Sequence, residues 1–222
     1  MSATGIGAQD FREMMVFVAG RITEEEAHLN ALDAAIGDGD HGITMQLGFE
    51  AVTRKLDELD LQTGIDGLFV EAGMAFMAAT GGASGVVFGK MFMAGGRSLK
   101  GRQQLGPPEF NSFLKAMESS VSSSGKVKPG DKTVLDAVAS AFQAIPDSEI
   151  PLLEVVTKAA TASEAAAQET ANMVCRVGRA SRLGDRALGH PDPGAVSFSI
   201  IMRAMADWLA ARRESPQQSQ GL

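Results

Sequence analysis

Three aspartates, Asp33, Asp38 and Asp40, lie within eight residues of a glycine-rich segment. The glycines at 37 and 39 disfavour a helix, so we expect a loop that folds back beside the end of a preceding helix. Three converging carboxylates repel one another unless cations neutralise them, and Mg²⁺ is a hard cation that prefers such oxygen ligands. The pattern therefore indicates a magnesium site, although a lone Asp-Gly-Asp more simply caps and turns a chain.

An EF-hand also begins with Asp-x-Asp, but this segment does not continue as one. An EF-hand loop that started at Asp38 would need glycine at its sixth position and glutamate at its twelfth. Those positions hold Ile43 and Phe49. The sequence excludes an EF-hand at this loop.

The acidic loop runs directly into a predicted helix at His41, Gly42, Ile43 and Thr44. Backbone N–H groups at a helix start, together with the helix dipole, favour an anion, and Thr44 adds a hydroxyl donor. A phosphate held between this helix start and metals on the three aspartates would make one coherent site. The spacing alone is equally compatible with His41 being an ordinary polar residue of a loop or helix start.

A second glycine segment, residues 81–85, reads Gly-Gly-Ala-Ser-Gly and contains Ala83 and Ser84. Its small residues would allow a ligand to approach the backbone at another helix start, or would allow two helices to pack closely. It is not a Walker A motif, because Lys90 comes too late, and no Gly-x-Gly-x-x-Gly follows a strand.

Two further segments carry polar residues between glycines, at 130–136 and 178–194. In the second, Arg179, Arg182 and Arg186 bring positive charge into a stretch rich in turn-forming residues. These arginines are compatible with a cover over phosphates or with a solvated basic face.

Nucleophilic catalysis has little support in the sequence. Cys175 lies among Ala, Val and Met, which favours a packed thiol over a nucleophile. A hydrolase triad drawn from Ser84, Ser181, His41 and His190 lacks the Gly-x-Ser-x-Gly elbow after a strand.

The elements that must position these segments are predicted to be helices. Methionine occurs 12 times, tyrosine is absent and aromatic residues make up 5% of the chain, a composition that favours an all-α fold. A Thr-Glu-Glu-Glu sequence at 23–26 reads as a capping box that restarts the chain after a first helix capped by Asp10. Apolar spacing predicts helices over about 10–22, 23–34, 43–59, 66–79, 86–93, 107–125, 133–145, 151–174 and 194–213.

Length and charge bound the remaining possibilities. The 222 residues are expected to form one domain over 1–214 with a polar, frayed tail at 215–222. A net charge of −7 is the wrong sign for nucleic-acid binding, and one cysteine excludes a disulfide framework. No apolar run approaches the roughly 18 residues of a membrane span and the first residues lack a basic signal-peptide start, so we expect a cytoplasmic protein.

Taken together and in order, the four segments resemble the nucleotide-binding L subunit of dihydroxyacetone kinase. The resemblance rests on Leu-Asp-Ala-Ala-Ile-Gly-Asp-Gly-Asp-His-Gly at 32–42, Gly-Gly-Ala-Ser-Gly at 81–85, Pro-Gly-Asp-Lys-Thr at 129–133, and 178–194, which begins Gly-Arg-Ala-Ser and ends Asp-Pro-Gly. It covers the chain from about Asp10 to Arg213.

The resemblance implies a closed barrel or bundle of antiparallel amphipathic helices with the nucleotide site at one rim. It implies two Mg²⁺ ions held by Asp33, Asp38 and Asp40, and ATP or a tightly bound ADP as the nucleotide. It further implies phosphate contacts from His41, Gly42, Ile43, Thr44, Ala83 and Ser84, base or ribose contacts from Gly125 and Val134, and closure of the site by Arg179, as the catalytic residue, with Asp192, Pro193 and Gly194.

The family's activity is phosphoryl transfer to a short hydroxyketone held covalently on a histidine of a separate K domain. This chain has no room for that domain, so the resemblance implies a K-type partner subunit and, in one version of the chemistry, a phosphotransferase-system protein as phosphodonor. The sequence does not choose between exchangeable ATP and a recharged ADP. Arg182 and Asp185 stand where an aromatic residue and a glutamate are usual, so the contacts of the covering segment are expected to differ from the family pattern.

A second hypothesis is a regulatory module that reports nucleotide state to another protein without turnover of its own. The identity of neighbouring genes would separate this hypothesis from a kinase subunit.

Overall fold

The computed structural model describes residues 5–146, 150–177 and 179–214, without the side chains of residues 179, 180, 182, 183 and 214. Within these ranges the secondary structure is helical, and the β-type pairing is one isolated bridge between Ile6 and Leu105. The prediction of an all-α fold is confirmed. The α-helices are α1 (Ala8–Glu24), α2 (Glu26–Ile36), α3 (His41–Glu58), α4 (Ile65–Ala79), α5 (Gly82–Ser98), α6 (Pro107–Gly125), α7 (Val134–Gln143), α8 (Leu152–Glu169) and α9 (Pro193–Glu214), with 3-10 helices η1 (Thr170–Asn172) and η2 (Arg179–Ala187).

The helices pack as a bundle whose order of neighbours closes on itself. α1 packs on α3, and the contacts then continue through α4, α5, α6, α7, α8 and α9 back to α1. α2 lies outside this ring, against α3 and α9. Each helix in the ring is therefore held on two sides, and its apolar stripe faces the interior.

Aromatic residues from distant helices form the middle of the core. Phe69 of α4 lies between Phe11 of α1 and Phe113 of α6, at ring-centroid distances of 4.5 and 4.2 Å. Phe49 and Phe76 join α3 to α4 edge-to-face at 5.6 Å. These rings are essentially fully buried, so their apolar surface contributes strongly to holding the helices together.

Glycines let α4 and α5 approach more closely than side chains would allow. A Cβ on Gly73 would lie 2.6 Å from the carbonyl oxygen of Gly89, and a Cβ on Gly89 would lie 2.7 Å from the Cβ of Met77. The first half of α5, which follows the Gly-Gly-Ala-Ser-Gly segment, is thereby fixed firmly against α4.

The predicted break near residue 23 is present, but the capping box is wrong. α1 continues through Thr23, whose hydroxyl donates to the carbonyl oxygen of Ala19, and the chain turns at Glu25. Asp10 is not the cap of α1 either, because the helix begins at Ala8 and Asp10 accepts a hydrogen bond from the Gly7 N–H at 3.3 Å. Asp10 is thus the third residue of the first turn, a position where an acid also satisfies a free amide.

The Ala-rich helix also ends earlier than its composition predicts. α8 stops at Glu169 and gives way to η1 instead of reaching Val174. The buried hydroxyl of Thr170 accepts the N–H of Asp192 at 2.8 Å. This long-range contact draws the chain away from the helix axis, an influence that helix propensity cannot report.

α9 is long and apolar for a helix of a folded domain. Pro193–Arg213 is the one described stretch that is long and apolar enough to cross a membrane by length and composition, with a mean hydropathy of 1.2. Arg203 and Asp207 interrupt its apolar run, so it does not stand out in the sequence as an unbroken apolar stretch. In the bundle α9 contacts α1, α7 and α8, and 56% of this window is buried, as in the core helix of a folded domain.

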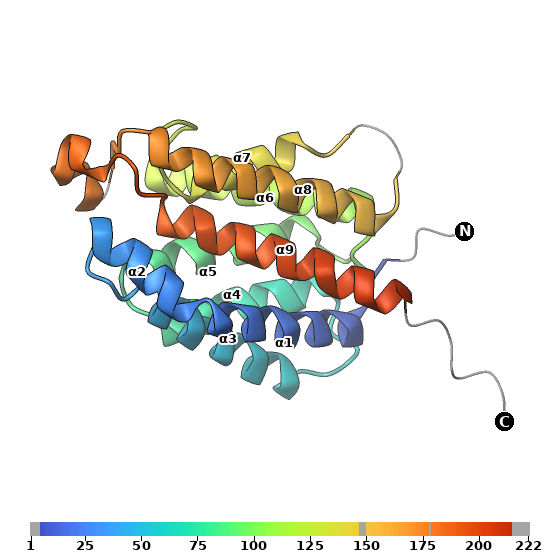
Figure 1. Cartoon of the computed structure of the whole chain (residues 1–222). Coiled ribbons are helices and arrows are strands. Elements are labelled where there is room, and N and C mark those ends of the chain that lie inside the picture. Colours follow the sequence, from blue (N-terminus) through green and yellow to red (C-terminus); the bar gives the residue numbers. More distant parts are fainter. Residues whose placement is uncertain (1–4, 147–149, 178, 215–222) are drawn as a thin grey trace, which may run out of the picture.

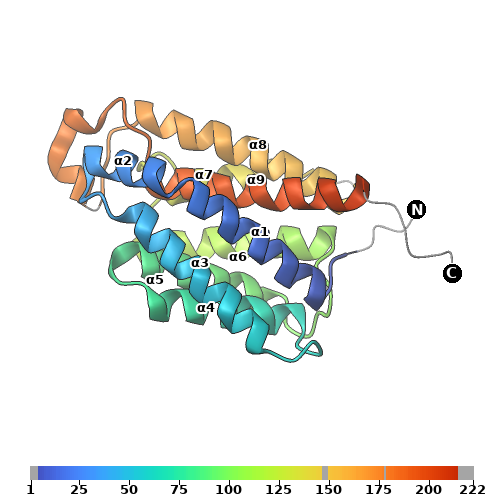
Figure 2. The ribbon, with the colours of Figure 1, turned by 60° about the horizontal axis from the view of Figure 1, so that its bottom comes forward.

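One end of the bundle gathers the segments singled out in the sequence. The end of α2 and the starts of α3, α5, α7 and α9 meet there, and η2 projects beyond them. The start of α1 and the end of α9 lie at the opposite end (Figures 1 and 2), where Arg212 pairs with Asp10. The predicted rim site is therefore at the end of the bundle that carries η2.

Candidate functional site

A cleft of about 730 Å³ opens at this end of the bundle, a size suited to a nucleotide-sized ligand. Most residues expected to bind metal or nucleotide line it. Two that do not are Gly42 and Ile43, and the side chain of Arg179 lies outside the described residues. The predicted residues that line the cleft are Asp33, Asp38, Asp40, His41, Thr44, Ala83, Ser84, Gly125, Val134, Asp192, Pro193 and Gly194.

The three aspartates converge as predicted. One carboxylate oxygen from each of Asp33, Asp38 and Asp40 lies within 4.8 Å of the others. Asp33, in the last turn of α2, accepts the N–H groups of Gly39 at 2.8 Å and Asp40 at 3.2 Å, so the loop folds over its carboxylate. Gly39 supports this fold with a φ of +82°. An oxygen-only set of this size fits Mg²⁺.

The start of α3 is bound to α2 more tightly than the sequence suggested. The Ile43 N–H donates to Oδ1 of Asn30 at 3.2 Å, and the Thr44 N–H donates to the Asp40 carbonyl at 2.9 Å. A Cβ on Gly42 would lie 2.1 Å from the carbonyl oxygen of Glu26. Gly42 and Ile43 therefore seat α3 on α2, and two of the amides expected to meet a phosphate already have partners.

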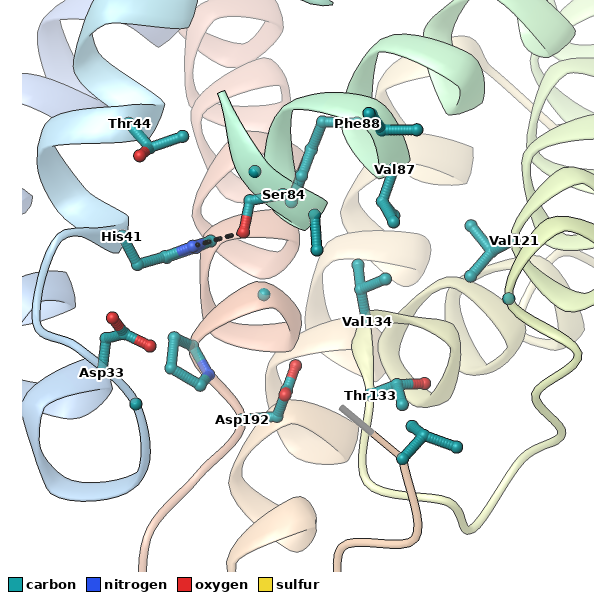
Figure 3. A pocket seen from close by; sticks show the side chains of 18 of the residues that line it. Asp33, His41, Thr44, Ser84, Val87, Phe88, Val121, Thr133, Val134 and Asp192 are labelled. Atoms are coloured by element: carbon teal, nitrogen blue, oxygen red, sulfur yellow. Dashed lines mark hydrogen bonds between the residues drawn. The ribbon is translucent and has the colours of Figure 1, made fainter. Parts of the chain in front are cut away.

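His41 is buried rather than displayed at the mouth of the cleft, with 5% of its surface exposed. Its Nδ1 lies 3.2 Å from the Ser84 hydroxyl at the start of α5, as Figure 3 shows, and its Nε2 lies 2.7 Å from the Ser197 hydroxyl of α9. Burial lowers the pKa of His41 to about 4, against the opposing effect of the Asp33 charge. The ring is thus neutral near pH 7 and links α3, α5 and α9.

The structure brings together only part of the hydrolase triad that the sequence analysis considered. His41 does contact Ser84, but its other nitrogen meets a serine instead of a carboxylate. His190 does not line the cleft, and its backbone carbonyl accepts a hydrogen bond from Lys132. The pair lacks the acid that orients the histidine of a hydrolase.

An apolar wall faces the acidic side of the cleft. Val134 was expected near a base or ribose, and it lies among other apolar side chains at the starts or ends of helices (Figure 3). The other apolar residues of this wall were not predicted from the sequence, where the one indication of them is their position next to glycine segments. They are Val87, Phe88, Val121, Val127 and Val177. A flat heterocycle would bury its faces against such a surface.

The Gly-Asp-Lys-Thr segment is a cap for α7. Thr133 accepts the Leu135 N–H at 3.2 Å, and the buried Asp136 carboxylate accepts the N–H groups of Thr133 at 2.8 Å and Gly130 at 2.5 Å. Asp131 accepts the Lys128 N–H at 2.9 Å. These bonds fix the turn that presents Val134 to the cleft.

Lys132 is a functional-site residue that the sequence did not reveal. It is 1% exposed, has a φ of +61°, and its Nζ donates to the carbonyls of Thr170 and His190, each at 2.6 Å. Burial lowers its pKa, and the charge of Asp192 opposes that shift. Lys132 thereby joins the α7 turn to both ends of the segment that carries η2.

Further contacts join the two ends of the segment that carries η2, residues 170–190, and so close its base. The Gly189 N–H donates to the carbonyl of Ala171 at 2.8 Å, beside the bonds made by Lys132. Ile36, Cys175 and Ala187 form a small separate apolar cluster that joins the segment to the end of α2. Cys175 is packed as expected: burial raises its pKa and its Sγ donates to the Val177 carbonyl at 3.1 Å.

Asp192 caps α9 at the floor of the cleft. Its Oδ2 accepts the Ala195 N–H at 2.8 Å, and its own N–H reaches Thr170. Burial raises the pKa of Asp192 to about 7, more than the Ala195 hydrogen bond lowers it. Near neutral pH this side chain is therefore partly protonated, which reduces its repulsion of an anion.

Comparison with known proteins gives matches over most of the chain. Residues 35–207 match the DAK2 domain family. The chain is 33% identical over 212 residues to the ADP-binding subunit DhaL of PEP-dependent dihydroxyacetone kinase 2 from Listeria innocua, covering 94% of this chain and 98% of that protein. It is 38% identical over 192 residues to the ADP-binding subunit DhaL of the PEP-dependent dihydroxyacetone kinase from Escherichia coli, covering 85% and 90%.

A solved structure shares the fold. The dihydroxyacetone kinase of C. freundii, in complex with AMP-PNP and Mg²⁺, superposes with a TM-score of 0.67 at 27% sequence identity. The match covers 88% of this chain and 33% of that one. The chain therefore spans about a third of the length of that kinase.

Proposed function

Since the chain belongs to the DAK2 domain family, as a nucleotide-binding L subunit of the dihydroxyacetone kinases, we propose that its cleft binds magnesium and ADP or ATP. In this proposal the phosphoryl group carried by the nucleotide passes to a short hydroxyketone held by a K-type partner subunit. The observation that carries it is the placement of three converging carboxylates and an apolar wall on opposite sides of one cleft. A nucleotide needs both surfaces at once, for its metal-bound phosphates and for its base.

The metal side uses Asp33, Asp38 and Asp40 as ligands. Asp33 is held by two loop amides, so its carboxylate is oriented before any ion arrives. Bound Mg²⁺ supplies positive charge that offsets the charge of the phosphate oxygens. The aspartates hold that charge at the end of the bundle where a partner could present its substrate.

The phosphate side uses the helix starts next to the loop. His41 and Thr44 line the cleft at α3, and Ala83 and Ser84 line it at α5, where the Ser84 hydroxyl and the helix dipoles favour an anion. Arg179, at the start of η2, is proposed to reach the phosphates when the site is filled. These groups position and stabilise the phosphates, and phosphoryl transfer depends on little else from the protein.

The nucleotide is proposed to remain bound as ADP and to be recharged by a phosphotransferase-system protein. Two relatives that match this chain over 90% or more of their own length are named ADP-binding subunits of PEP-dependent kinases. An exchangeable ATP is the alternative donor, and dialysis distinguishes the two. A retained ADP would survive dialysis in the presence of Mg²⁺ and would be released by a chelator.

Titration calorimetry of the purified chain with ADP, with and without Mg²⁺, tests the site. We expect binding that requires the metal, and no phosphorylation of dihydroxyacetone until a K-type subunit and a phosphodonor are added. The Asp38→Asn variant, carried through the same preparation, controls for contaminating kinases. Metal-independent ADP binding would contradict the metal site, whereas ketose phosphorylation by the chain alone would contradict the two-subunit model.

A further inference from the structure

The loop that carries two of the proposed metal ligands, Asp38 and Asp40, is tethered to the end of α2. The Gly37 N–H donates to the carbonyl of Asp33, and the Asp33 carboxylate accepts the N–H groups of Gly39 and Asp40. This first tether holds the loop from its α2 side. It depends on a carboxylate that also belongs to the proposed metal site.

A second tether lies just beyond the loop, at the start of α3. Asn30 precedes Asp33 by three residues on α2, and its Oδ1 accepts the Ile43 N–H at 3.2 Å. Gly42 allows this close approach, because a Cβ there would lie 2.1 Å from the carbonyl oxygen of Glu26 and 2.8 Å from Oδ1 of Asn30. The loop is therefore held between two points of one helix, about a turn apart.

The two neighbours of Asn30 require a carboxamide at this position. Nδ2 of Asn30 donates to Oε1 of Glu26 at 2.7 Å, while Oδ1 accepts from Ile43. A reversed amide would turn its NH₂ group toward the Ile43 donor and its oxygen toward the Glu26 carboxylate, so both bonds would be lost. An aspartate would keep an acceptor but would place two carboxylates side by side.

Asn30 differs from Asp33 in its relation to the ion. Asp33 lines the cleft and is a proposed ligand, whereas Asn30 does not line the cleft. We propose that Asn30 is a positioning residue for the metal site, which fixes the start of α3 on α2 and thereby holds the carboxylates of Asp38 and Asp40 at the spacing that Mg²⁺ requires. This inference rests on the proposed function, because it takes a magnesium ion as the ligand of the acidic loop.

A tether of this kind matters more for a small cation than for a large one. Mg²⁺ demands near-ideal octahedral geometry at 2.0–2.1 Å, whereas Ca²⁺ accepts variable geometry at 2.3–2.6 Å. A loop released from Asn30 still offers the same carboxylates, but at a less fixed spacing. Loss of the tether should therefore reduce the preference for Mg²⁺ over Ca²⁺, whereas a general folding defect would weaken the binding of both ions equally.

Calorimetric titration with Mg²⁺-ADP and with Ca²⁺-ADP tests this preference. Asn30→Ala is expected to weaken binding of Mg²⁺-ADP roughly fivefold and that of Ca²⁺-ADP less than twofold, a modest loss because the Asn30–Ile43 bond is exposed to solvent. Gln9→Ala is the matched control. Gln9 also donates its amide to a glutamate four residues on, Glu13, at 2.9 Å, but at the opposite end of the bundle. We expect this control to bind both complexes as the wild type does.

An exchange of the two side chains adds a test by rescue. Asn30→Asp alone should lose preference for Mg²⁺, because the new carboxylate is repelled by that of Glu26. The double variant Glu26→Gln/Asn30→Asp places the amide donor at position 26 and the acceptor at position 30, so it should regain most of the wild-type preference. A double variant no better than Asn30→Asp alone would contradict the tether.

Amide hydrogen exchange measures the tether without any metal or nucleotide. In the metal-free chain, Asn30→Ala should speed exchange of the Ile43 amide and also of the Gly39 and Asp40 amides inside the loop. Faster exchange at Ile43 alone would show that Asn30 caps α3 without holding the loop, and would overturn the inference.

The binding outcomes separate the inference from the proposed function. If the wild-type chain fails to bind Mg²⁺-ADP, the proposed function falls and the inference falls with it. If the wild type binds, but Asn30→Ala weakens binding of both complexes equally or of neither, the inference alone is overturned. A reduced preference for Mg²⁺ with a restored preference in the exchange variant supports both.

Discussion

Two glycine-containing segments with paired acids line the same cleft and use those acids in opposite ways. In the loop after α2, Asp38 and Asp40 are exposed, and their carboxylates converge with that of Asp33. In the turn before α7, Asp131 and Asp136 are buried and accept backbone N–H groups. The same residue types therefore provide ligands in one segment and hold the backbone in the other.

The two segments differ in the source of the groups that offset the negative charge of their aspartates. The turn before α7 supplies its own donors, so its carboxylates stabilise the fold with or without a ligand. The acidic loop brings like charges within 4.8 Å of one another, an arrangement that a cation would favour. The contrast predicts that changes on the loop alter binding, whereas changes on the turn alter folding.

The largest expected effect is on the loop. Asp38→Asn removes one negative charge from the cation site and should weaken Mg²⁺-ADP binding by about 3 kcal/mol, roughly a hundredfold. Without metal its melting temperature should be unchanged or slightly higher, because one repulsive charge is gone. Calorimetry and thermal melting in a chelator measure both quantities. Unchanged affinity in both Asp38→Asn and Asp40→Asn would refute the metal assignment.

The next largest effect is expected on the free energy of unfolding, from a change in the turn before α7. Lys132→Met leaves the buried carbonyls of Thr170 and His190 without their donor and should lower the free energy of unfolding by about 2–4 kcal/mol. Lys126→Met is a matched control, because Lys126 also has a positive φ, of 51°, but an exposed side chain. Urea denaturation should separate the two variants clearly. Equal stability of the two would show that the Nζ contacts contribute nothing.

A smaller effect should appear in the pH dependence of stability. Asp192 has a pKa raised to about 7, so between its unfolded value of 3.8 and 7 the folded state binds more protons and stability falls as pH rises. His41 has a pKa lowered from 6.5 to about 4, so between those values the unfolded state binds more protons and stability rises with pH. The two contributions oppose each other between pH 4 and 6.5.

Asp192→Asn keeps a side-chain oxygen for the cap of α9 but removes the falling contribution. We therefore expect the variant's stability to rise more steeply than that of the wild type between pH 4 and 6.5, in urea titrations without metal. Asp185→Asn, at an exposed position of η2, should follow the wild-type curve. Parallel curves for the wild type and Asp192→Asn would contradict the raised pKa.

The smallest effect should come from the cap itself. Thr133→Ala removes the hydroxyl that accepts the Leu135 N–H and should lower the free energy of unfolding by about 1 kcal/mol. Thr133→Ser retains the hydroxyl and should lose much less. Guanidinium denaturation of the two variants measures the difference, and an equal loss in both would assign the effect to the methyl group instead.

Much of the fold and of the candidate site could be predicted from the chemistry of short stretches of sequence. The acidic loop, the helix starts at the glycine segments and the all-α fold follow from spacing and propensity within short windows. The aspartates at 33, 38 and 40 were identified because repulsion among nearby carboxylates is visible in the chain itself.

Contacts between distant segments were not predictable in that way. His41 reaches Ser197 across 156 residues, and Lys132 reaches Thr170 and His190 across 38 and 58. Nothing near His41 or Lys132 in the sequence indicates burial, since both stand in segments of glycine and charge. Their roles depend on the closure of the bundle, which single-segment patterns do not encode.

The closed base of the η2 segment has a consequence for engineering. Its two ends are held by the Gly189–Ala171 bond and by the Lys132 ammonium, and neither contact depends on the residues in between. The entropy of joining the ends grows only slowly with the length of chain between them. A peptide tag inserted near Gly184, which is exposed, would therefore be carried on a fixed support, and the cleft floor at Asp192 would keep its shape.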